Sequence, residues 1–311
     1  MTDGRRPGTV GTAAPDAAAP TRSPGEAARM AAERSGVEVR LLHDLTDLTG
    51  VVALFDRIWR PDGKSPLVNI EQLRALTHAG NYLAGAFDSD GRLVGACVGF
   101  FAAPPGVGLH SHIAGVDGQA QGRSVGFALK LHQRVWARER GLTEITWTFD
   151  PLIRRNAYFN FVKLGARPRE YLVDFYGEID DAINAGQGTD RLLVAWQLAS
   201  DAVAEICVGN RVEADVELMR ADGAVVALAE GASGLPEVAS AALRNDARTL
   251  LVRIPADVEA LRRSDPGAAK RWRLALRDVL GELIDDGASV TGFSRSGWYT
   301  VERHRHPRRQ S

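Results

Sequence analysis

The amino-acid sequence predicts an α/β (α+β) fold, with a mixed, mostly antiparallel sheet and flanking helices, plus a smaller C-terminal α/β subdomain. Short segments of alternating apolar and polar residues, which are typical of strands, are interleaved with segments whose apolar residues recur at helical spacing. The Asp90-Gly91 pair between two strand-like segments favours a hairpin and therefore antiparallel pairing. Of the 311 residues, 45% are hydrophobic, which is enough for one large core or two ordinary ones.

The first 35 residues (1–35) are expected to form a disordered tail, because they are rich in Ala, Pro, Gly, Thr and Arg and show no apolar period. An organelle-targeting peptide is an alternative, but Asp3, Asp16 and scattered prolines argue against it. A start site at Met30, just before the first structured segment, is another alternative.

A first domain is expected over residues 37–199, in the order strand, helix, helix, three strands, helix, strand, helix and two strands. Local signals mark its elements: Asp44 and Thr46 offer side-chain caps to the first helix, and Gly141 stops the third. Pro151 terminates a strand in which apolar residues alternate with threonines. The strands are expected at 37–42, 82–87, 93–102, 109–116, 144–149, 171–176 and 192–198, and the helices at 48–59, 69–78, 124–140 and 156–164.

A C-terminal α/β subdomain is expected over residues 202–304, after the sequence becomes rich in Ala and Glu. The basic residues at the end are interpreted as a solvated tail over 305–311. Within the subdomain, strands are expected at 250–254, 290–293 and 299–302, and a helix at 268–283.

Composition argues against several classes of function. The formal net charge is -1, so the chain has no overall basic field and a nucleic-acid partner is not expected. No apolar run approaches the roughly 18 residues of a membrane helix, so no membrane partner is expected. Cys97 and Cys207 lie in apolar surroundings without metal-ligand spacing and are too few for a disulfide framework, so a reduced cytoplasm and no metal are expected.

The segment Gln121-Gly122-Arg123-Ser124-Val125-Gly126 stands between an expected strand and an expected helix. A helix N-terminus offers unpaired N–H groups and about half a positive charge, so it attracts phosphate. Gly122 and Gly126 let a ligand approach the backbone closely, and Arg123 adds a charge-assisted contact. An ordinary strand-to-helix turn, with glycines for steric reasons, explains the same spacing equally well.

Residues 37–198 resemble the GNAT superfamily of acyl-CoA N-acyltransferases in element order and in the position of this glycine turn. The family's pyrophosphate motif is Q/R-x-x-G-x-G/A, which Gln121 and Gly126 match, while Ser124 replaces the central glycine. A second phase through Arg123, Gly126 and Ala128 also fits but starts too deep in the helix. The resemblance implies a GNAT-like sheet and a co-substrate, acetyl-CoA or succinyl-CoA, whose diphosphate lies on Gln121, Gly122, Arg123, Ser124, Val125 and Gly126.

A second segment resembles the family's next landmark. Strand residues 146–151 are followed by Asn156-Ala157-Tyr158-Phe159 and then by Lys163-Leu164-Gly165-Ala166. The tyrosine that protonates the departing thiolate in many members falls here on Phe161, so Tyr158 is the substitute candidate. The resemblance also implies that Asn156 binds the amides of the pantetheine arm, with an N-terminal helix cap as the alternative.

Three further segments, Ser111-His112, 147–152 and 297–303, resemble a bacterial GNAT branch with an extended C-terminal region. Some relatives in that branch are associated with N-succinylation of amino acids by succinyl-CoA. The C-terminal subdomain is expected either to cover the acceptor site or to form a homodimer surface, and the sequence does not choose between them.

Amine acylation needs a proton acceptor, a donor to the oxyanion and a way for the thiolate to leave. His112 is one candidate base, because its ordinary pKa of about 6.5 suits proton uptake at neutral pH, although a core histidine would look the same. Asp150 is another, with capping of the following turn as its alternative. A backbone N–H near Ala114 to Val116 is the expected oxyanion donor.

The sequence therefore predicts an acyl-CoA-dependent N-acyltransferase that transfers an acetyl or succinyl group to a small amine or amino acid by direct attack. The alternative is a non-catalytic acyl-CoA-binding sensor or interaction module, which Ser124 and Phe161 favour, because both depart from the family's pattern.

Overall fold

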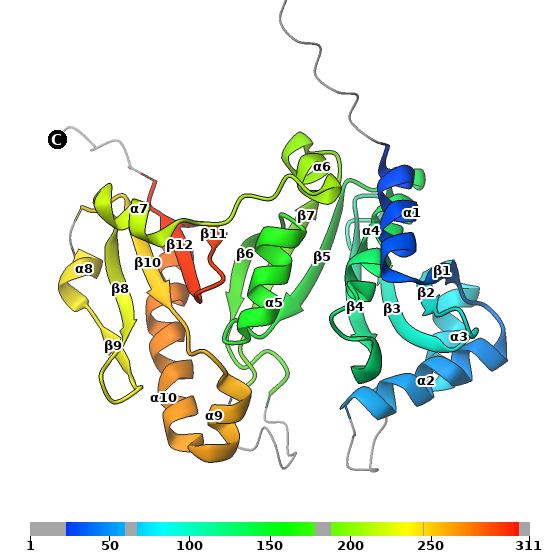
Figure 1. The fold of residues 1–311 in the computed structure, drawn as a ribbon, viewed down its shortest axis with the longest axis horizontal. Coiled ribbons are helices and arrows are strands. Elements are labelled where there is room, and N and C mark those ends of the chain that lie inside the picture. The colour runs from blue at the N-terminus through cyan, green and yellow to red at the C-terminus, as the bar shows by residue number, and fades with distance from the viewer. Residues whose placement is uncertain (1–22, 60–66, 178–187, 245, 305–311) are drawn as a thin grey trace, which may run out of the picture.

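The computed structural model describes residues 23–59, 67–177, 188–244 and 246–304, which form two sheets with flanking helices (Figure 1). The first sheet has the strand order β1-β2-β3-β4-β5-β7-β6, and all its neighbours are antiparallel except β4 and β5. The second has the order β11-β12-β10-β8-β9, in which β10 and β8 are the parallel pair. The predicted mixed, mostly antiparallel α/β fold is confirmed.

From β1 onward, the first sheet and its helices follow the predicted order. A 3-10 turn at Gly118–Ala120 precedes α4, and a π-helical turn at Phe159–Lys163 continues α5. The strands are β1 (Glu38–Leu41), β2 (Tyr82–Phe87), β3 (Leu93–Phe101), β4 (Gly108–Val116), β5 (Glu144–Phe149), β6 (Arg167–Leu172) and β7 (Arg191–Gln197). The helices are α1 (Pro24–Ser35), α2 (Leu45–Trp59), α3 (Ile70–His78), α4 (Val125–Glu139) and α5 (Arg154–Tyr158).

The second sheet contains the three predicted strands and two that the sequence pattern did not reveal, β8 and β9. Its strands are β8 (Val225–Glu230), β9 (Pro236–Val238), β10 (Thr249–Arg253), β11 (Ser289–Phe293) and β12 (Trp298–Glu302). The helices are α6 (Asp201–Val208), α7 (Val216–Ala221), α8 (Ser240–Arg244), α9 (Val258–Ser264), α10 (Pro266–Leu276) and α11 (Glu282–Asp285), with a π-helical turn at Arg277–Gly281 between the last two. The predicted helix at 268–283 corresponds to α10, this turn and the start of α11.

Helices cover both faces of the first sheet, because its strands are apolar on both sides. On β3, Ala96 and Val98 pack with α2 residues such as Phe55, whereas Cys97 between them belongs to the cluster that contains α4. This alternation is the period of two that a strand imposes on its side chains. It places α4 on one face and α2 on the other, so the start of α4 lies next to the end of β4.

The predicted disordered tail is wrong for residues 24–35, which form α1. Ser23 and Glu26 make a capping box at its start, and Gly36 ends it in the left-handed conformation. Ala27 and Ala31 are buried in the main core, and α1 packs against α4. Small apolar side chains therefore give this helix a buried face without a strong hydrophobic period. Residues 1–22 and 305–311 lie outside the described residues, so the predictions for both tails are untested there.

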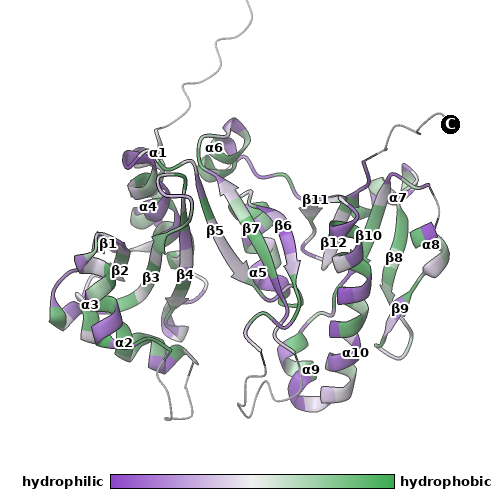
Figure 2. Ribbon diagram, turned by 180° about the vertical axis from the view of Figure 1, so that it is seen from behind, coloured by the Kyte–Doolittle hydropathy of each residue, from purple (hydrophilic) through white to green (hydrophobic). Residues whose placement is uncertain are grey.

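The two sheets share one core. A single cluster of buried apolar residues includes Trp147 and Trp196 of the first sheet together with Trp272 and Tyr299 of the second part. Apolar residues follow β3, β7 and β8, with hydrophilic residues interspersed on helices such as α10 (Figure 2). The shared cluster means that the second part of the chain packs directly against the first. The domain boundary between residues 199 and 202 stays a prediction.

Among the helices that the structure describes, none combines the length and the hydropathy that a bilayer crossing requires.

Candidate functional site

The parallel strands β4 and β5 separate soon after they pair. Their register contains Gly108 with Glu144, Leu109 with Ile145 and His110 with Thr146, and it ends there. Beyond His110, β4 continues to Val116 and stays paired with β3 on its other edge, while β5 turns away (Figure 1). The β5-facing edge of β4 therefore has no ladder partner in β5 past His110.

A β-bulge lies in β4 at the point of this separation. Val98 pairs with Ile113 and the adjacent Gly99 pairs with Ser111, so His112 is the extra residue. Bulges re-aim side chains and interrupt pairing, and they are frequent beside functional sites. The sequence placed the oxyanion donor near Ala114 and Val116, which face Cys97 and Gly95 of β3 in regular register. The irregularity lies two residues earlier, at His112.

The loop that follows β4 presents free backbone donors. Gly122 and Ser124 both adopt positive φ, 83° and 66°, on either side of Arg123. For the N–H groups of residues 122–126, no acceptor exists among the described residues, since the first helical bonds come from Phe127 and Ala128 to the Ser124 carbonyl. Consecutive N–H groups without partners at a helix N-terminus are suited to bind an anion.

The two glycines of this loop leave room for a ligand. A Cβ atom at Gly122 would meet no atom within 4 Å, and one at Gly126 would lie 3.7 Å from Val116 Cγ2. The protein itself therefore does not need glycine at residue 126. Gly126 also has no left-handed φ, so the absence of a side chain there favours close approach of something other than the chain.

The side chain of Arg123 does not point to this anion site. Its Nη2 donates to the carbonyl oxygens of Ser35 and Gly36, both at 3.1 Å, and so closes the C-terminus of α1. The predicted charge-assisted contact from Arg123 is therefore wrong for the side chain, while its backbone N–H remains among the free donors. The side chain of Gln121 is exposed and makes no hydrogen bond with the described residues.

A buried lysine bridges the two strands where they part. Lys130 of α4 is 5% exposed, donates to Ser111 Oγ at 3.1 Å, and lies 3.9 Å from the ring centre of Trp147. Ser111 and Trp147 directly follow the last β4–β5 pair. Gln133 Oε1 accepts a second bond from Lys130 at 2.7 Å, and burial lowers the pKa of Lys130 to about 8. Within the described ranges no carboxylate pairs with this ammonium, which is instead held by hydrogen bonds and a cation–π contact.

His110 and His112 flank the ring of Phe100, with ring centres 5.3 and 5.8 Å from it. Burial lowers the pKa of both imidazoles, and His112 and Lys130 lower that of His110 further. His110 Nδ1 lies 3.1 Å from Thr146 Oγ1, whereas the ring of His112 has no hydrogen bond with any described residue. The side chain of His112 is exposed to solvent, and its lowered pKa favours the neutral imidazole, which is the form that a proton acceptor needs.

Asp150 is not placed to act as a base. Its carboxylate accepts two bonds from Arg273, at 2.7 and 2.9 Å, and one from Arg262 at 2.6 Å. It also accepts the N–H of Leu152 at 3.0 Å, which is the turn-capping role that the sequence left open. Burial raises the pKa of Asp150, but the two guanidinium groups outweigh it and hold the pKa well below the usual range. The predicted catalytic role is therefore wrong, because this carboxylate fastens the second part of the chain to the first.

Tyr158 and Phe161 both face the second sheet. The Tyr158 hydroxyl donates to Glu213 at 3.2 Å and accepts from Arg295 at 2.9 Å. Phe161 is buried and stacks on Phe293. These contacts favour a role for Tyr158 in joining the two parts of the chain over the predicted role of proton donor to a thiolate.

Asn156 lies on α5 and is not its N-cap, a position that Ile153 occupies. The alternative role of helix cap is therefore wrong. Its side chain makes no hydrogen bond to the residues that the structure describes, so it stays the predicted ligand of the pantetheine amides.

Comparisons with known proteins find likeness in structure alone. No protein-family model matches this chain, and no curated protein does. The structure of an N-acetyltransferase from Staphylococcus aureus Mu50 is 15% identical with a TM-score of 0.44, and the match covers 52% of this chain and 98% of that one. The ribosomal-protein-S18-alanine N-acetyltransferase of Escherichia coli is 14% identical with a TM-score of 0.42, covering 53% and 95%.

A third solved structure is a GNAT family N-acetyltransferase from Escherichia coli in complex with CoA. It is 14% identical with a TM-score of 0.35, and the match covers 56% of this chain and 85% of that one. These names agree with the family that the sequence resembles. At such identities and TM-scores they carry no argument about substrate, so the function has to be inferred from the residues of the site.

Lys130 and the partners of Asp150 were missed at the level of sequence. Lys130 interrupts the apolar run from Phe127 to Leu131, and a charged residue inside such a run is a readable signal of a buried polar contact. Arg262 and Arg273 lie 112 and 123 residues after Asp150, and no spacing rule connects residues that far apart.

Proposed function

We propose that this chain is an acyl-CoA-dependent N-acyltransferase, which moves an acetyl or succinyl group from coenzyme A to a small amine or amino acid. One observation carries the proposal: β4 loses β5 as a neighbour at His110 and then leads into a loop whose N–H groups at 122–126 have no acceptor among the described residues. A diphosphate fits such donors, and an extended arm fits the unpaired strand edge.

Different residues of the chain would bind the co-substrate and accept the proton. The N–H groups of residues 122–126 would hold the diphosphate, and the β5-facing edge of β4, with the amide of Asn156, would hold the pantetheine arm. The bound thioester supplies an activated acyl carbon. The acceptor nitrogen forms a bond to that carbon, the carbon–sulfur bond breaks, and His112 takes the proton that the nitrogen loses.

Two features of the site support direct attack. His112 lies at the bulge, where the strand has one residue more than its neighbour, and its lowered pKa favours the unprotonated form. The ammonium of Lys130 contacts residues of both strands at their separation, so it fixes the spacing of β4 and β5 there and adds positive charge near a developing oxyanion. A homodimer and a cytoplasmic location remain part of the proposal.

Calorimetric titration with coenzyme A tests the binding half of this proposal. Gly126→Val places a branched side chain where the protein leaves space, and Gly25→Val is its matched control, because both glycines are the second residue of a helix and neither has left-handed φ. We expect wild type and Gly25→Val to bind coenzyme A, and Gly126→Val to lose at least tenfold in affinity. Equal binding by both variants, or none by wild type, contradicts the proposal.

The second candidate function is a non-catalytic acyl-CoA sensor. Asp150, Tyr158 and Phe161 favour it, since none of these three is placed to move a proton. Thiol release from acetyl-CoA and succinyl-CoA across a panel of amines and D- and L-amino acids separates the two functions. Turnover with any acceptor rules out the sensor, whereas coenzyme A binding without turnover on the whole panel supports it.

A further inference from the structure

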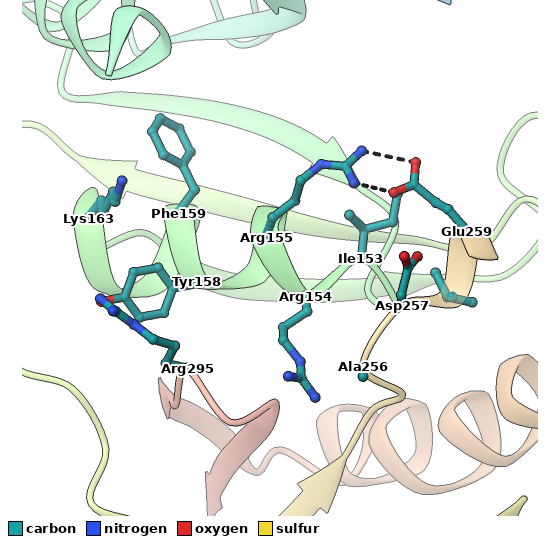
Figure 3. A pocket seen from close by; sticks show the side chains of 11 residues that line it. Ile153, Arg154, Arg155, Tyr158, Phe159, Lys163, Ala256, Asp257, Glu259 and Arg295 are labelled. Atoms are coloured by element: carbon teal, nitrogen blue, oxygen red, sulfur yellow. Dashed lines mark hydrogen bonds and ion pairs between the residues drawn. The ribbon is translucent and has the colours of Figure 1, made fainter. Parts of the chain in front are cut away.

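A pocket of about 560 Å³ lies between α5 and the C-terminal part of the chain (Figure 3). Its walls come from α5 and the π-helical turn after it, from residues 256–259 at the start of α9, and from the turn between β11 and β12. This volume is in the range of small-molecule sites. The polar side chains around it are mainly cationic: Arg154, Arg155, Lys163 and Arg295.

The two carboxylates of the pocket are already committed to other groups. Glu259 pairs with both terminal nitrogens of Arg155, as the dashed lines in Figure 3 show. Asp257 accepts the N–H of Ala260 at 2.9 Å and caps α9. Neither carboxylate is thus paired with the other three cations that line this space.

None of those three cations forms an ion pair within the described ranges, although Glu213 lies near Arg295 and Glu230 lies near Arg154. Lys163 makes no hydrogen bond or ion pair there, and burial together with Arg211 and Arg295 lowers its pKa. Arg154 has two buried nitrogens, Nε and Nη2, with no acceptor. The guanidinium of Arg295 finds a neutral one, the Tyr158 hydroxyl, at 2.9 Å. A buried cation without an acceptor, such as the guanidinium of Arg154, is costly unless an anion lies close to it.

Arg154 is held in place by the backbone beneath it. A Cβ atom at Gly297 would lie 2.6 Å from both Nε and Nη2 of Arg154, so the guanidinium rests directly on this glycine. Gly297 has φ +94°, a conformation that side chains rarely adopt. The position of this unpaired cation is therefore built into the turn between β11 and β12.

We propose that this pocket binds a small organic anion with two or more negative charges, of the di- or tricarboxylate or phosphate-ester class. Lys163 and Arg295 supply the charge-assisted hydrogen bonds, the buried charge of Arg154 adds to the positive potential, and the rings of Tyr158 and Phe159 contact the carbon skeleton. Such a ligand touches α5 together with the β11–β12 turn, so its binding stabilises the contact between the two parts of the chain. This inference does not depend on the proposed acyltransfer.

The test is calorimetric titration and thermal unfolding with citrate and with pyrophosphate, carried out in the Gly126→Val background so that the donors at 122–126 are blocked. Acetate at equal ionic strength is the monoanion control. We expect citrate or pyrophosphate to bind and to raise Tm by several degrees, and acetate to leave it unchanged.

Lys163→Met removes one charge and keeps most of the apolar stem, and Lys270→Met is the matched control on the exposed face of α10. We expect affinity for the dianionic or trianionic probe to fall at least tenfold in Lys163→Met and to change less than twofold in Lys270→Met. Circular dichroism confirms that both variants are folded. Binding of neither probe, or equal affinity in both variants, would overturn the proposal.

Discussion

The substitution Asp150→Asn distinguishes a structural role of this carboxylate from a catalytic role. The amide keeps the shape of the side chain and the oxygen that accepts the Leu152 N–H, but it removes the charge between Arg262 and Arg273. Asp150 is 8% exposed and Arg273 is 2% exposed, so the guanidinium stays away from water after it loses the charge of Asp150. Breaking a buried pair by removing one partner costs about 3–5 kcal/mol.

For a chain of 311 residues, about 3–5 kcal/mol corresponds to a fall in Tm of roughly 5–8 °C. The control is Glu33→Gln, which breaks an exposed pair with Arg29 and should cost less than about 0.5 kcal/mol. Urea unfolding monitored by circular dichroism gives both values. The acyltransfer rate of folded Asp150→Asn is measured in the same buffer at low temperature. We expect this rate to stay within a few-fold of the wild-type rate.

The pH dependence of this variant follows from the pKa of Asp150, which the two arginines hold well below its usual range. The stability that the charged form contributes is present above the unfolded pKa of about 3.9 and is lost as the pH falls toward the folded pKa. The difference between wild type and Asp150→Asn should therefore shrink below about pH 4. A variant that is as stable as wild type at pH 7 but inactive would refute the structural role.

Three further outcomes follow from the site. Ser124→Gly should raise the free energy of unfolding by about 1 kcal/mol, because glycine adopts the left-handed conformation of residue 124 without strain, and urea unfolding that shows a loss would contradict this. His112→Gln should lower kcat/KM about 100-fold and abolish an acid limb that lies below pH 6.5, since burial lowers the pKa of His112; a pH–rate profile identical to wild type would exclude it as the base. Lys130→Met should raise the free energy of unfolding at pH 7 by about 1–2 kcal/mol. That gain should shrink as the pH rises from about 8 toward 10.5, because wild type recovers stability once Lys130 is neutral in both states; a pH-independent difference between 7 and 10.5 would refute it.

The order of elements could be predicted because each depends on local signals. Gly141 and Gly165 lie where the helices end, and the Asp90-Gly91 turn joins β2 to β3 as expected. The helix at 24–35 could also have been predicted, because Ser23 and Glu26 have the spacing of a capping box. The alanine-rich composition instead favoured the prediction of a disordered tail.

Long-range charge pairing could not be predicted from the same information. Asp150 before Pro151 fits a turn cap and a base equally well, and only the fold brings Arg262 and Arg273 to it. The side chain of Arg123 is a similar case, since the α1 carbonyls that it binds come from a segment expected to be disordered. The sequence therefore predicted the backbone donors of the site better than the roles of its charged side chains.

The aromatic ring at position 161 limits how the proposed chemistry can end. Phe161 stacks on Phe293 and meets the edge of Tyr299, both in the second sheet. A tyrosine hydroxyl introduced there would be buried in an apolar interface, at a cost of about 1–3 kcal/mol if it formed no hydrogen bond. Packing of the second sheet therefore disfavours an ionisable group at residue 161. In the proposed reaction, the departing thiolate would take its proton from solvent or from a residue other than 161.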